Sequence, residues 1–495
     1  MYAKITYDDA VNNRIFSNPV AKRIIAVLPA HNEENDIAET LKSLRMMKKP
    51  KDIIFDIFIA LDNCTDNTEE VIRKNAEDLN IYILETVDNK ERKVGALNQV
   101  YRLFFGDMLE TAEPLAEQHK SVVKNIVAYL GIDADIYMDK NALTTLYSEL
   151  TSKFNIGSVS ANYTCLMPES KRRLRQDDPE AENKIKNGNY GGIIARFITS
   201  QQNKSFSQWT LEQKNDGYNA TIAGGQCTLF SPKAFQEVYD KLKLNGIYDD
   251  STDTEDLLLT QELRKLGWQP KISHSARCYV GAMKTMHSYT SQQTKWRIGK
   301  LDYTTKSGVS TAYARKNWVD ELTLIMNVIT RAMLLVLIPS SIALGMFQYN
   351  WIWFLPILFS VILNTIVAIK TPRVRFIDIL TSVFLISPEF SIWFDFIIDV
   401  KSWRELSRVE RKDAWAEQER AENSHGKLGI GAISVLVVVA LVILGLYFKV
   451  ISVDSALMTL KPYIISAFSV LTYMAVFATI LMINKLIKIR GSFKA

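Results

Sequence analysis

The segment VAYLGIDADIYMD, residues 127–139, decides how the first part of this chain folds. It begins as an apolar run typical of a buried strand, and after Ile132 it presents two aspartates one residue apart. Residues i and i+2 of a strand point to the same side, so Asp133 and Asp135 are expected to point together at the strand's carboxyl end. Two neighbouring carboxylates repel, and burying them without a counter-charge costs several kcal/mol. A positive group is therefore expected between them.

Similar short apolar runs recur through the first 315 residues and alternate with amphipathic segments. The expected strands are RIIAVLPA (23–30), IIFDIFIALD (53–62), IYILET (81–86), NIVAYLGIDAD (125–135) and IGSVSANY (156–163). The expected helices include residues 35–47, 67–78 and 92–105. This alternation predicts an α/β domain with a largely parallel, doubly wound sheet. Ligands of such sheets bind at the carboxyl ends of the strands, which is where PAHNEE, LDNCTDNT and DAD stand.

Length and composition narrow the class of protein. A chain of 495 residues is too long for one hydrophobic core, so at least two units are expected. The 59 basic and 54 acidic residues give a net charge of only +5, which provides no signal of nucleic-acid binding. The opening residues, MYAKITYDDAVNNR, are polar and do not resemble a signal peptide. The scattered cysteines form no CxxC pair and no zinc spacing, so reduced thiols are expected. They are Cys64, Cys165, Cys227 and Cys278.

The mean hydropathy of −0.02 averages two unlike parts. Residues 1–315 read as a soluble α/β domain, whereas residues 316–495 contain long apolar runs. Each run reaches the roughly 20 residues needed to cross about 30 Å of hydrocarbon, so four membrane spans are predicted. They are residues 322–347, 351–369, 428–448 and 463–483.

Two further segments are expected to lie along the membrane surface, residues 375–397 and 401–425. The first carries Asp378, Pro388, Glu389 and Asp395, and charges at mid-membrane cost roughly 2.5–3.5 kcal/mol each. If it does not cross, every basic loop falls on one side together with the N-terminal domain. We therefore expect a multi-pass protein of the plasma (inner) membrane, with both termini and the catalytic domain in the cytoplasm.

Three motifs carry chemistry, and each also has an ordinary structural explanation. Asp133 and Asp135 suit a hard divalent cation, Mg²⁺ or Mn²⁺, but aspartates are also common in solvated turns. In TEDLLLTQELRKLGW (254–268) a helix capped by Thr254 or Asp253 places Glu255 and Asp256 in its first turn, where acidic residues also compensate the helix dipole. QQTKWRIGK (292–300) also fits the start of a juxtamembrane helix with snorkelling cations.

Taken in order, the motifs resemble those of family 2 glycosyltransferases, in particular the membrane-integrated branch that includes cellulose, chitin and hyaluronan synthases. The resemblance rests on seven segments over residues 27–296, and the membrane spans match only in kind. The segments are VLPAHNEENDIAETLKSL, LDNCTDNTEEVI, ERKVGALNQV, DADI, AGGQCTLF, TED and QQTKW.

The resemblance implies a GT-A-like catalytic domain, a UDP-sugar donor and inversion at the anomeric carbon. It implies that Asp133 and Asp135 hold Mg²⁺ or Mn²⁺ and that Asp256, beside Glu255, is the catalytic base. Gly224, Gly225, Gln226 and Trp296 would form the acceptor side. The residues implied in donor binding are Ala30, His31, Glu33, Asp62, Lys93, Asp133, Gln292, Gln293 and Lys295. The implied partners are the donor, a growing glycan or lipid acceptor and the bilayer, with a homo-oligomer left open.

The chain departs from the family pattern in ways that leave its function open. Lys295 replaces the usual arginine of the QQTKW segment, and a lysine lacks the bidentate fork for phosphate; whether Arg297 compensates is not decided by the sequence. No spans precede the catalytic domain, and no FxVTxK-like gating loop is found. Three functions therefore stand: a processive synthase that exports a β-linked polysaccharide, a transferase that adds one sugar to a lipid or lipid-linked glycan, and a transporter or sensor with an idle nucleotide-binding domain.

Overall fold

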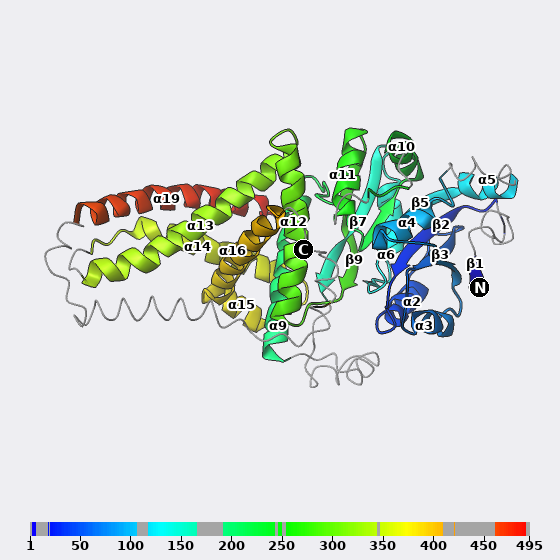
Figure 1. Cartoon of the computed structure of the whole chain (residues 1–495), viewed down its shortest axis with the longest axis horizontal. Coiled ribbons are helices and arrows are strands. Elements are labelled where there is room, and N and C mark those ends of the chain that lie inside the picture. Colours follow the sequence, from blue (N-terminus) through cyan, green and yellow to red (C-terminus); the bar gives the residue numbers. More distant parts are fainter. Residues whose placement is uncertain are drawn as a thin grey trace. The chain divides into compact units, whose positions relative to one another are not determined.

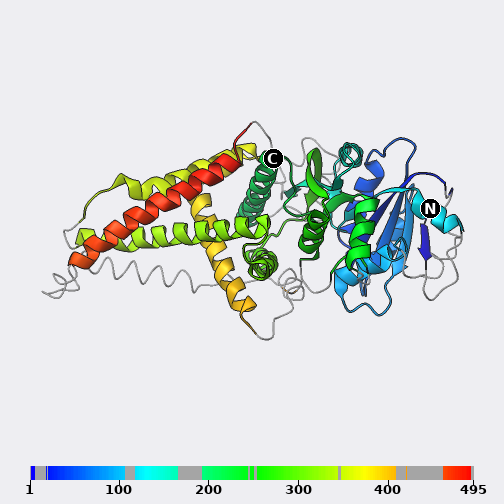
Figure 2. The same cartoon turned by 90° about the horizontal axis from the view of Figure 1, so that it is seen from above.

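The computed structural model describes residues 2–5, 18, 20–105, 117–165, 192–242, 246–249, 254–343, 347–408, 420 and 461–491. The chain divides into two compact units (Figures 1 and 2). The first contains Met1–Leu166 and Trp209–Ala282, and the second contains Met167–Gln208 and Met283–Lys494. The helix α9 (Ile193–Asn215) crosses from the second unit into the first.

The first unit is built on one nine-stranded sheet with the order β1-β4-β3-β2-β5-β8-β7-β9-β6. Neighbouring strands from β1 to β5 run parallel, and β7 runs parallel to β9. The strands are β1 (Tyr2–Ile5), β2 (Arg23–Ala30), β3 (Ile54–Leu61), β4 (Asn80–Glu85), β5 (Ile126–Ile132), β6 (Tyr137–Met138), β7 (Ile156–Cys165), β8 (Cys227–Phe230) and β9 (Gln269–Val280).

Helices cover both faces of this sheet. One face packs against α4, α10 and α11 through a core that includes Val27, Phe58, Tyr101 and Phe235. Figure 1 shows α2 and α3 together on the other side of β2 and β3. The helices of this unit are α2 (Ile37–Met46), α3 (Thr68–Lys74), α4 (Arg92–Tyr101), α5 (Glu117–Lys124), α6 (Ala142–Leu150), α10 (Pro232–Leu242) and α11 (Glu255–Lys265).

The expected doubly wound GT-A-like domain is confirmed, and all five predicted strands and three predicted helices are present. The sheet is more mixed than expected, however. β8 is antiparallel to both β5 and β7, and β6 is antiparallel to β9. The strands β6, β8 and β9 were not predicted from the sequence.

The second unit is helical, and three of its described helices are long and apolar enough to cross a membrane: Ala312–Ile342, Trp351–Lys370 and Pro462–Lys488. They correspond to the first, second and fourth predicted spans. The third, residues 428–448, lies outside the described residues. The helices of this unit after α9 are α12 (Met286–Ser307), α13 (Ala312–Ala343), η2 (Trp351–Phe354), α14 (Leu355–Lys370), α15 (Phe376–Val383), α16 (Ile386–Leu406) and α19 (Lys461–Lys488).

The ambiguous segment 375–397 forms two helices instead of one. α15 ends before Phe384, and α16 begins after Leu385, whose φ of 66° lies in the left-handed region. Neither helix is among the three that are long and apolar enough to cross. Buried Arg331 of α13 pairs with Glu389 of α16 at 2.8 Å, so a charge in the first predicted span has a partner from the broken segment. Residues 409–419 and 421–425 of the second expected surface segment lie outside the described residues.

Candidate active site

The site is assembled by strand register at the carboxyl edge of the sheet. Ala30 of β2 lies opposite Leu61 of β3, so the residues that follow each strand meet. His31 Nδ1 consequently lies 2.5 Å from the carbonyl oxygen of Asp62. β5 runs parallel to β2 on its other side, which brings Asp133 and Asp135 to the same edge. Parallel register therefore gathers three motifs that are about 30 to 100 residues apart in sequence.

The antiparallel strand β8 adds the glycine-rich segment. Its first residue, Cys227, pairs with Ile132, the last residue of β5. The chain that enters β8 must therefore pass beside the aspartates that leave β5. A Cβ on Gly225 would lie 3.0 Å from Lys93 Nζ and 3.7 Å from Asp133 Oδ1, so the absence of a side chain lets the backbone approach this pair.

Lys93 is a positive group that lies between two acids of the site, Asp133 and Glu255. Its Nζ lies 2.6 Å from Asp133 Oδ1 and 3.8 Å from Glu255 Oε1. Burial alone would lower the pKa of Lys93, but the carboxylates of Asp133, Glu255 and Asp256 raise it above its ordinary value. Lys93 is therefore a fixed positive charge in the centre of the site.

Two carboxyl groups in the site have pKa values close to neutral pH. Burial, followed by the charge of Asp133, raises the pKa of Asp135 to about 7. Burial, followed by the charge of Glu255, raises the pKa of Asp256 to about 7. Leu257 N donates a 2.8 Å hydrogen bond to Asp256 Oδ1, but this contribution does not offset the desolvation. Asp256 can therefore bind and release a proton near neutral pH, and it interacts with the charge of Lys93.

α11 presents both acids at its first turn, as expected. Thr254 is the N-cap residue, although its side chain makes no capping hydrogen bond. Asp253, the other expected cap, lies outside the described residues. Thr260 Oγ1 donates to the carbonyl of Asp256 and accepts from Ala223 N, 2.8 Å away, which ties α11 to the glycine-rich segment.

The proposed nucleotide side is pre-organised by hydrogen bonds. Asp62 is buried, and its Oδ1 accepts from Asn63, Thr86 and Asn89 at 3.0, 2.8 and 2.7 Å. Glu33 is held through its backbone nitrogen, which donates to Thr68 Oγ1 at 2.8 Å.

Sequence reasoning missed two residues that support the site. Asn98 of α4 accepts from Ile247 N and Tyr248 N, both at 3.0 Å, and donates to Tyr248 O at 2.9 Å. Burial, followed by Tyr101 and then by the charges of Glu255, Asp256 and Asp133, raises the pKa of Tyr248. Asn98 stands in the quoted KVGALN motif, whereas nothing in the sequence around Tyr248 indicated its role.

The remaining candidates lie on α12 of the second unit. Gln293 Nε2 donates to Gln292 Oε1 at 3.4 Å, and Lys295 is buried. The ring of Trp296 packs at 6.3 Å from that of Phe206 on α9.

The donor set at the sheet edge fits a hard cation together with a diphosphate. Four carboxyl groups, those of Asp133, Asp135, Glu255 and Asp256, interact with Lys93. Carboxylate oxygens are the ligands that Mg²⁺ and Mn²⁺ prefer, and phosphate oxygens complete such sites. Within the described part of the chain, no group of three or more His, Cys, Asp or Glu converges as a metal cluster by itself.

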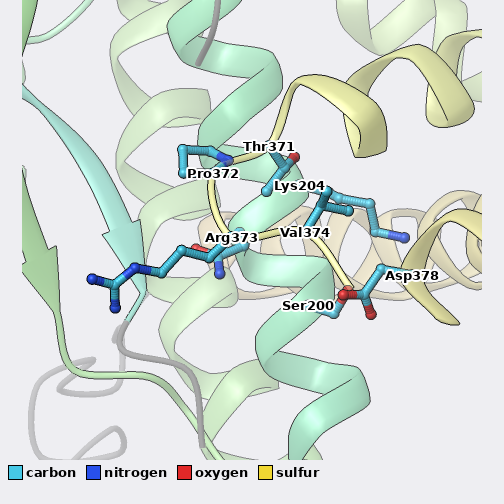
Figure 3. Close-up of a pocket in the computed structure, with 8 residues that line it drawn as sticks. Ser200, Lys204, Thr371, Pro372, Arg373, Val374 and Asp378 are labelled. Atoms are coloured by element: carbon cyan, nitrogen blue, oxygen red, sulfur yellow. The ribbon is translucent and has the colours of Figure 1, made fainter. Parts of the chain in front are cut away.

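The second unit also contains a small pocket, which is separate from these motifs (Figure 3). Ser200 and Lys204 of α9 line it together with Arg373 and Asp378. Figure 3 shows the ammonium of Lys204 and the guanidinium of Arg373 extending in opposite directions. Lys204 Nζ donates to Ser382 and Ser387, so it fastens α9 to the α15–α16 region.

Comparisons with known proteins agree with this reading of the motifs. Seven curated relatives match, all described as poly-beta-1,6-N-acetyl-D-glucosamine synthase from strains of Staphylococcus aureus, including MSSA476 and MW2. The match is 25% identical over 276 residues, 56% of this chain and 54% of the relative. The chain thus spans about half the length of the curated relatives it matches.

The solved structures that match include a mannosyltransferase from Pyrobaculum calidifontis in complex with GDP-Man and Mn²⁺. It is 14% identical, with a TM-score of 0.37, and the match covers 96% of this chain and 93% of that chain. The S. aureus TarS fragment 1–349 is 12% identical, with a TM-score of 0.32, and the match covers 82% of this chain and 94% of that chain. Both TM-scores are low.

Family models give the most specific result. The model described as "Glycosyl transferase family 2" matches residues 25–239, and the model described as "Glycosyl transferase family group 2" matches residues 187–369. Together they extend from the first strand of the site to the end of the second predicted span. The chain belongs to the family 2 glycosyltransferases, of the membrane-integrated type.

Proposed function

We propose that this glycosyltransferase takes a UDP-linked sugar, inverts its anomeric carbon and extends a β-linked polysaccharide at a membrane. The observation that carries the proposal is the group of carboxylates around Lys93 at the carboxyl edge of the sheet. An arrangement of fixed opposite charges suits a reaction in which negative charge moves onto a leaving diphosphate.

The reaction assigns a separate task to each side of the site. Asp256 takes the proton from the acceptor hydroxyl while that oxygen attacks the anomeric carbon, and the bond to the diphosphate breaks. Attack from the face opposite the leaving group inverts the configuration. Lys93 binds the leaving diphosphate, and Glu255 keeps the pKa of Asp256 high enough for it to accept a proton near neutral pH.

A divalent cation held by Asp133 and Asp135 would neutralise charge on the leaving diphosphate. His31, Glu33 and Asp62, with the backbone at Ala30, bind the uracil and ribose. On the acceptor side, Gly224, Gly225 and Gln226 shape the surface beside Lys93. On α12, Gln292, Gln293 and Lys295 bind the diphosphate, and Trp296 supports the acceptor sugar.

The membrane part serves to keep the growing chain at the bilayer and to export it. In support, the second unit has three helices long and apolar enough to cross, and the curated relatives are described as polysaccharide synthases. The basic segments KTPRVR and KLIKIRGSFKA follow the second and the fourth predicted spans. An even number of predicted crossings separates each of them from the catalytic domain, so by the positive-inside pattern we place this domain in the cytoplasm.

The test is donor turnover by the detergent-solubilised full chain. UDP release is measured with a panel of UDP-sugars in the presence of Mg²⁺ or Mn²⁺, beginning with UDP-N-acetylglucosamine because the curated relatives polymerise that sugar. A radiolabelled product that forms a ladder of long chains supports the synthase. A single lipid-soluble species would assign the chain to a non-processive transferase, and no UDP release from any donor would overturn the proposal.

A further inference from the structure

The segment Gln292–Trp296 lies between two anchors on α12. On its N-terminal side, the ring of Tyr289 stacks on that of Phe394 of α16, with centroids 4.6 Å apart and planes 5° apart. On its C-terminal side, Arg297 Nη1 lies 2.6 Å from Glu321 Oε1 of α13 and 3.7 Å from Asp399 Oδ1 of α16. At 1.5 Å per helical residue the anchors are about 12 Å apart, so they bracket the segment closely.

The second anchor is a buried charge cluster that joins three helices. Lys300 of α12 also approaches Glu321, at 3.5 Å. The side chains of Glu321 and Asp399 are only 4% and 7% exposed. Carboxylates this deeply buried need cations nearby, and removing one partner of a buried pair leaves an uncompensated charge. Arg297, which supplies the shortest contact, is therefore the residue on which the cluster depends most.

Arginine suits this position better than lysine. Its planar guanidinium presents several donors in a fixed geometry and can face two carboxylates from different helices at once. A lysine ammonium keeps the charge but has no such fork. The same contacts direct Arg297 to α13 and α16, which answers whether it substitutes for the arginine that the QQTKW segment lacks at Lys295.

We propose that Arg297 is a positioning residue: through Glu321 and Asp399 it fixes the orientation of α12 and thereby of Gln292, Gln293 and Trp296. This inference rests on the proposed function, in which these three side chains contact donor and acceptor. Arg297 itself acts only through the helix that it holds.

Steady-state kinetics of three variants of the full chain test the proposal. Misplacing binding groups costs rate and affinity together, so Arg297→Gln should lower kcat/KM for the sugar donor by about 10- to 100-fold, with a higher KM and a lower kcat. Arg297→Lys should recover part of that loss. Lys306→Gln is the matched control. It removes an ion pair with Asp302 on the same helix, but the Lys306 side chain is 67% exposed, so this variant should behave like the wild type.

A double-mutant cycle separates positioning from a general loss of stability. Glu321→Gln should resemble Arg297→Gln, and the double variant should be little worse than either single one, because both remove the same contact. Activity is expressed per folded molecule, from the monodisperse peak and the melting temperature in detergent. Wild-type kcat and KM in folded Arg297→Gln, or strictly additive effects of the two changes, would overturn the inference. If the wild-type chain turned over no donor, the proposed function would fail instead.

Discussion

At the residue scale, Asp256 is the side chain whose environment is most closely matched to one chemical task. Its carboxyl is desolvated and faces Glu255, yet Lys93 is close enough to favour the ionised form in part. A base is most effective when its pKa is near the working pH, and a pKa of about 7 meets that condition.

Asp256→Asn should slow transfer strongly while leaving nucleotide binding intact. The amide oxygen can still accept the hydrogen bond from Leu257 N, so the start of α11 should keep its structure. Loss of a positioned base should lower kcat by about 10²–10⁴-fold. Calorimetric UDP binding and donor turnover measure the two effects separately, and unchanged turnover would remove Asp256 from this role.

The pH dependence should follow from the same carboxyl. Below pH 7 Asp256 is largely protonated and cannot accept a proton, so kcat/KM should rise as pH increases through about 7 and then level off. Glu255→Gln removes the negative neighbour that raises this pKa, so the rising limb should move to lower pH. A profile of kcat/KM against pH for both proteins measures the shift, and superimposable limbs would contradict the assignment.

The paired aspartates should govern cation-dependent donor binding. Asp133→Ala combined with Asp135→Ala removes both proposed oxygen ligands of the cation but keeps Lys93. UDP affinity should then no longer respond to Mn²⁺, whereas the wild-type affinity should increase with it. Titrations of UDP with and without Mn²⁺ test this, and a normal Mn²⁺-dependent affinity in the double variant would refute the metal role.

At the element scale, sequence patterns predicted the strands whose own residues carry a clear apolar pattern. β2, β3 and β5 are mostly apolar runs, as buried parallel strands usually are, and the charged Arg23 of β2 and Asp56 of β3 pair with each other. β9 was missed because it contains Pro270, Ser273 and His274 and is only partly buried. Its register with β7 shifts, and Asn162 of β7 spans the irregularity by donating to the carbonyls of Ser273 and Ala276. The sequence around β9 gives no sign of these hydrogen bonds, because their donor lies more than a hundred residues away.

The same limit applied to the site. The motifs gave Lys93, Asp133 and Asp256, because charged residues at strand and helix ends are visible in sequence. The contribution of Asn98 was invisible, because its partners at 247 and 248 are about 150 residues away.

Asn98→Ala should therefore destabilise the first unit and lower activity together. It removes the partner of two buried backbone amides and one carbonyl, and leaving such groups unsatisfied costs about 1–3 kcal/mol. Thermal unfolding and donor turnover measure both effects. Asn75→Ala is a suitable control, since that side chain donates only locally, to Val71 O at 2.8 Å on its own helix. An Asn98→Ala protein as stable as this control would contradict the role.

At the scale of the whole molecule, the break at Leu385 determines the predicted topology. α15 has only 8 residues, and both α15 and α16 carry buried acidic residues that have partners, among them Asp378 with Arg375 and Asp399 with Arg297. Because this segment does not form one long apolar helix, we expect the chain to enter and leave it on the same side of the membrane.

Two accessibility measurements test this topology. A protease site inserted after Arg408, which follows α16, should be protected in right-side-out cells. A single cysteine in place of Tyr349, which is 71% exposed between α13 and η2, should react with an impermeant maleimide from outside. Cleavage at Arg408 would mean that the 375–397 segment crosses the bilayer after all.

In the proposed reaction, the contact between Lys93 and Asp133 limits how tightly the enzyme can retain the nucleotide diphosphate that is released. An incoming diphosphate has to replace a partner that the lysine already possesses, so only the difference between the two attachments is available as affinity. When the sugar has gone, the internal partner stands ready to reclaim the lysine. Asp133 thus competes with the released diphosphate for Lys93, and this competition favours rapid release of the nucleotide between successive additions.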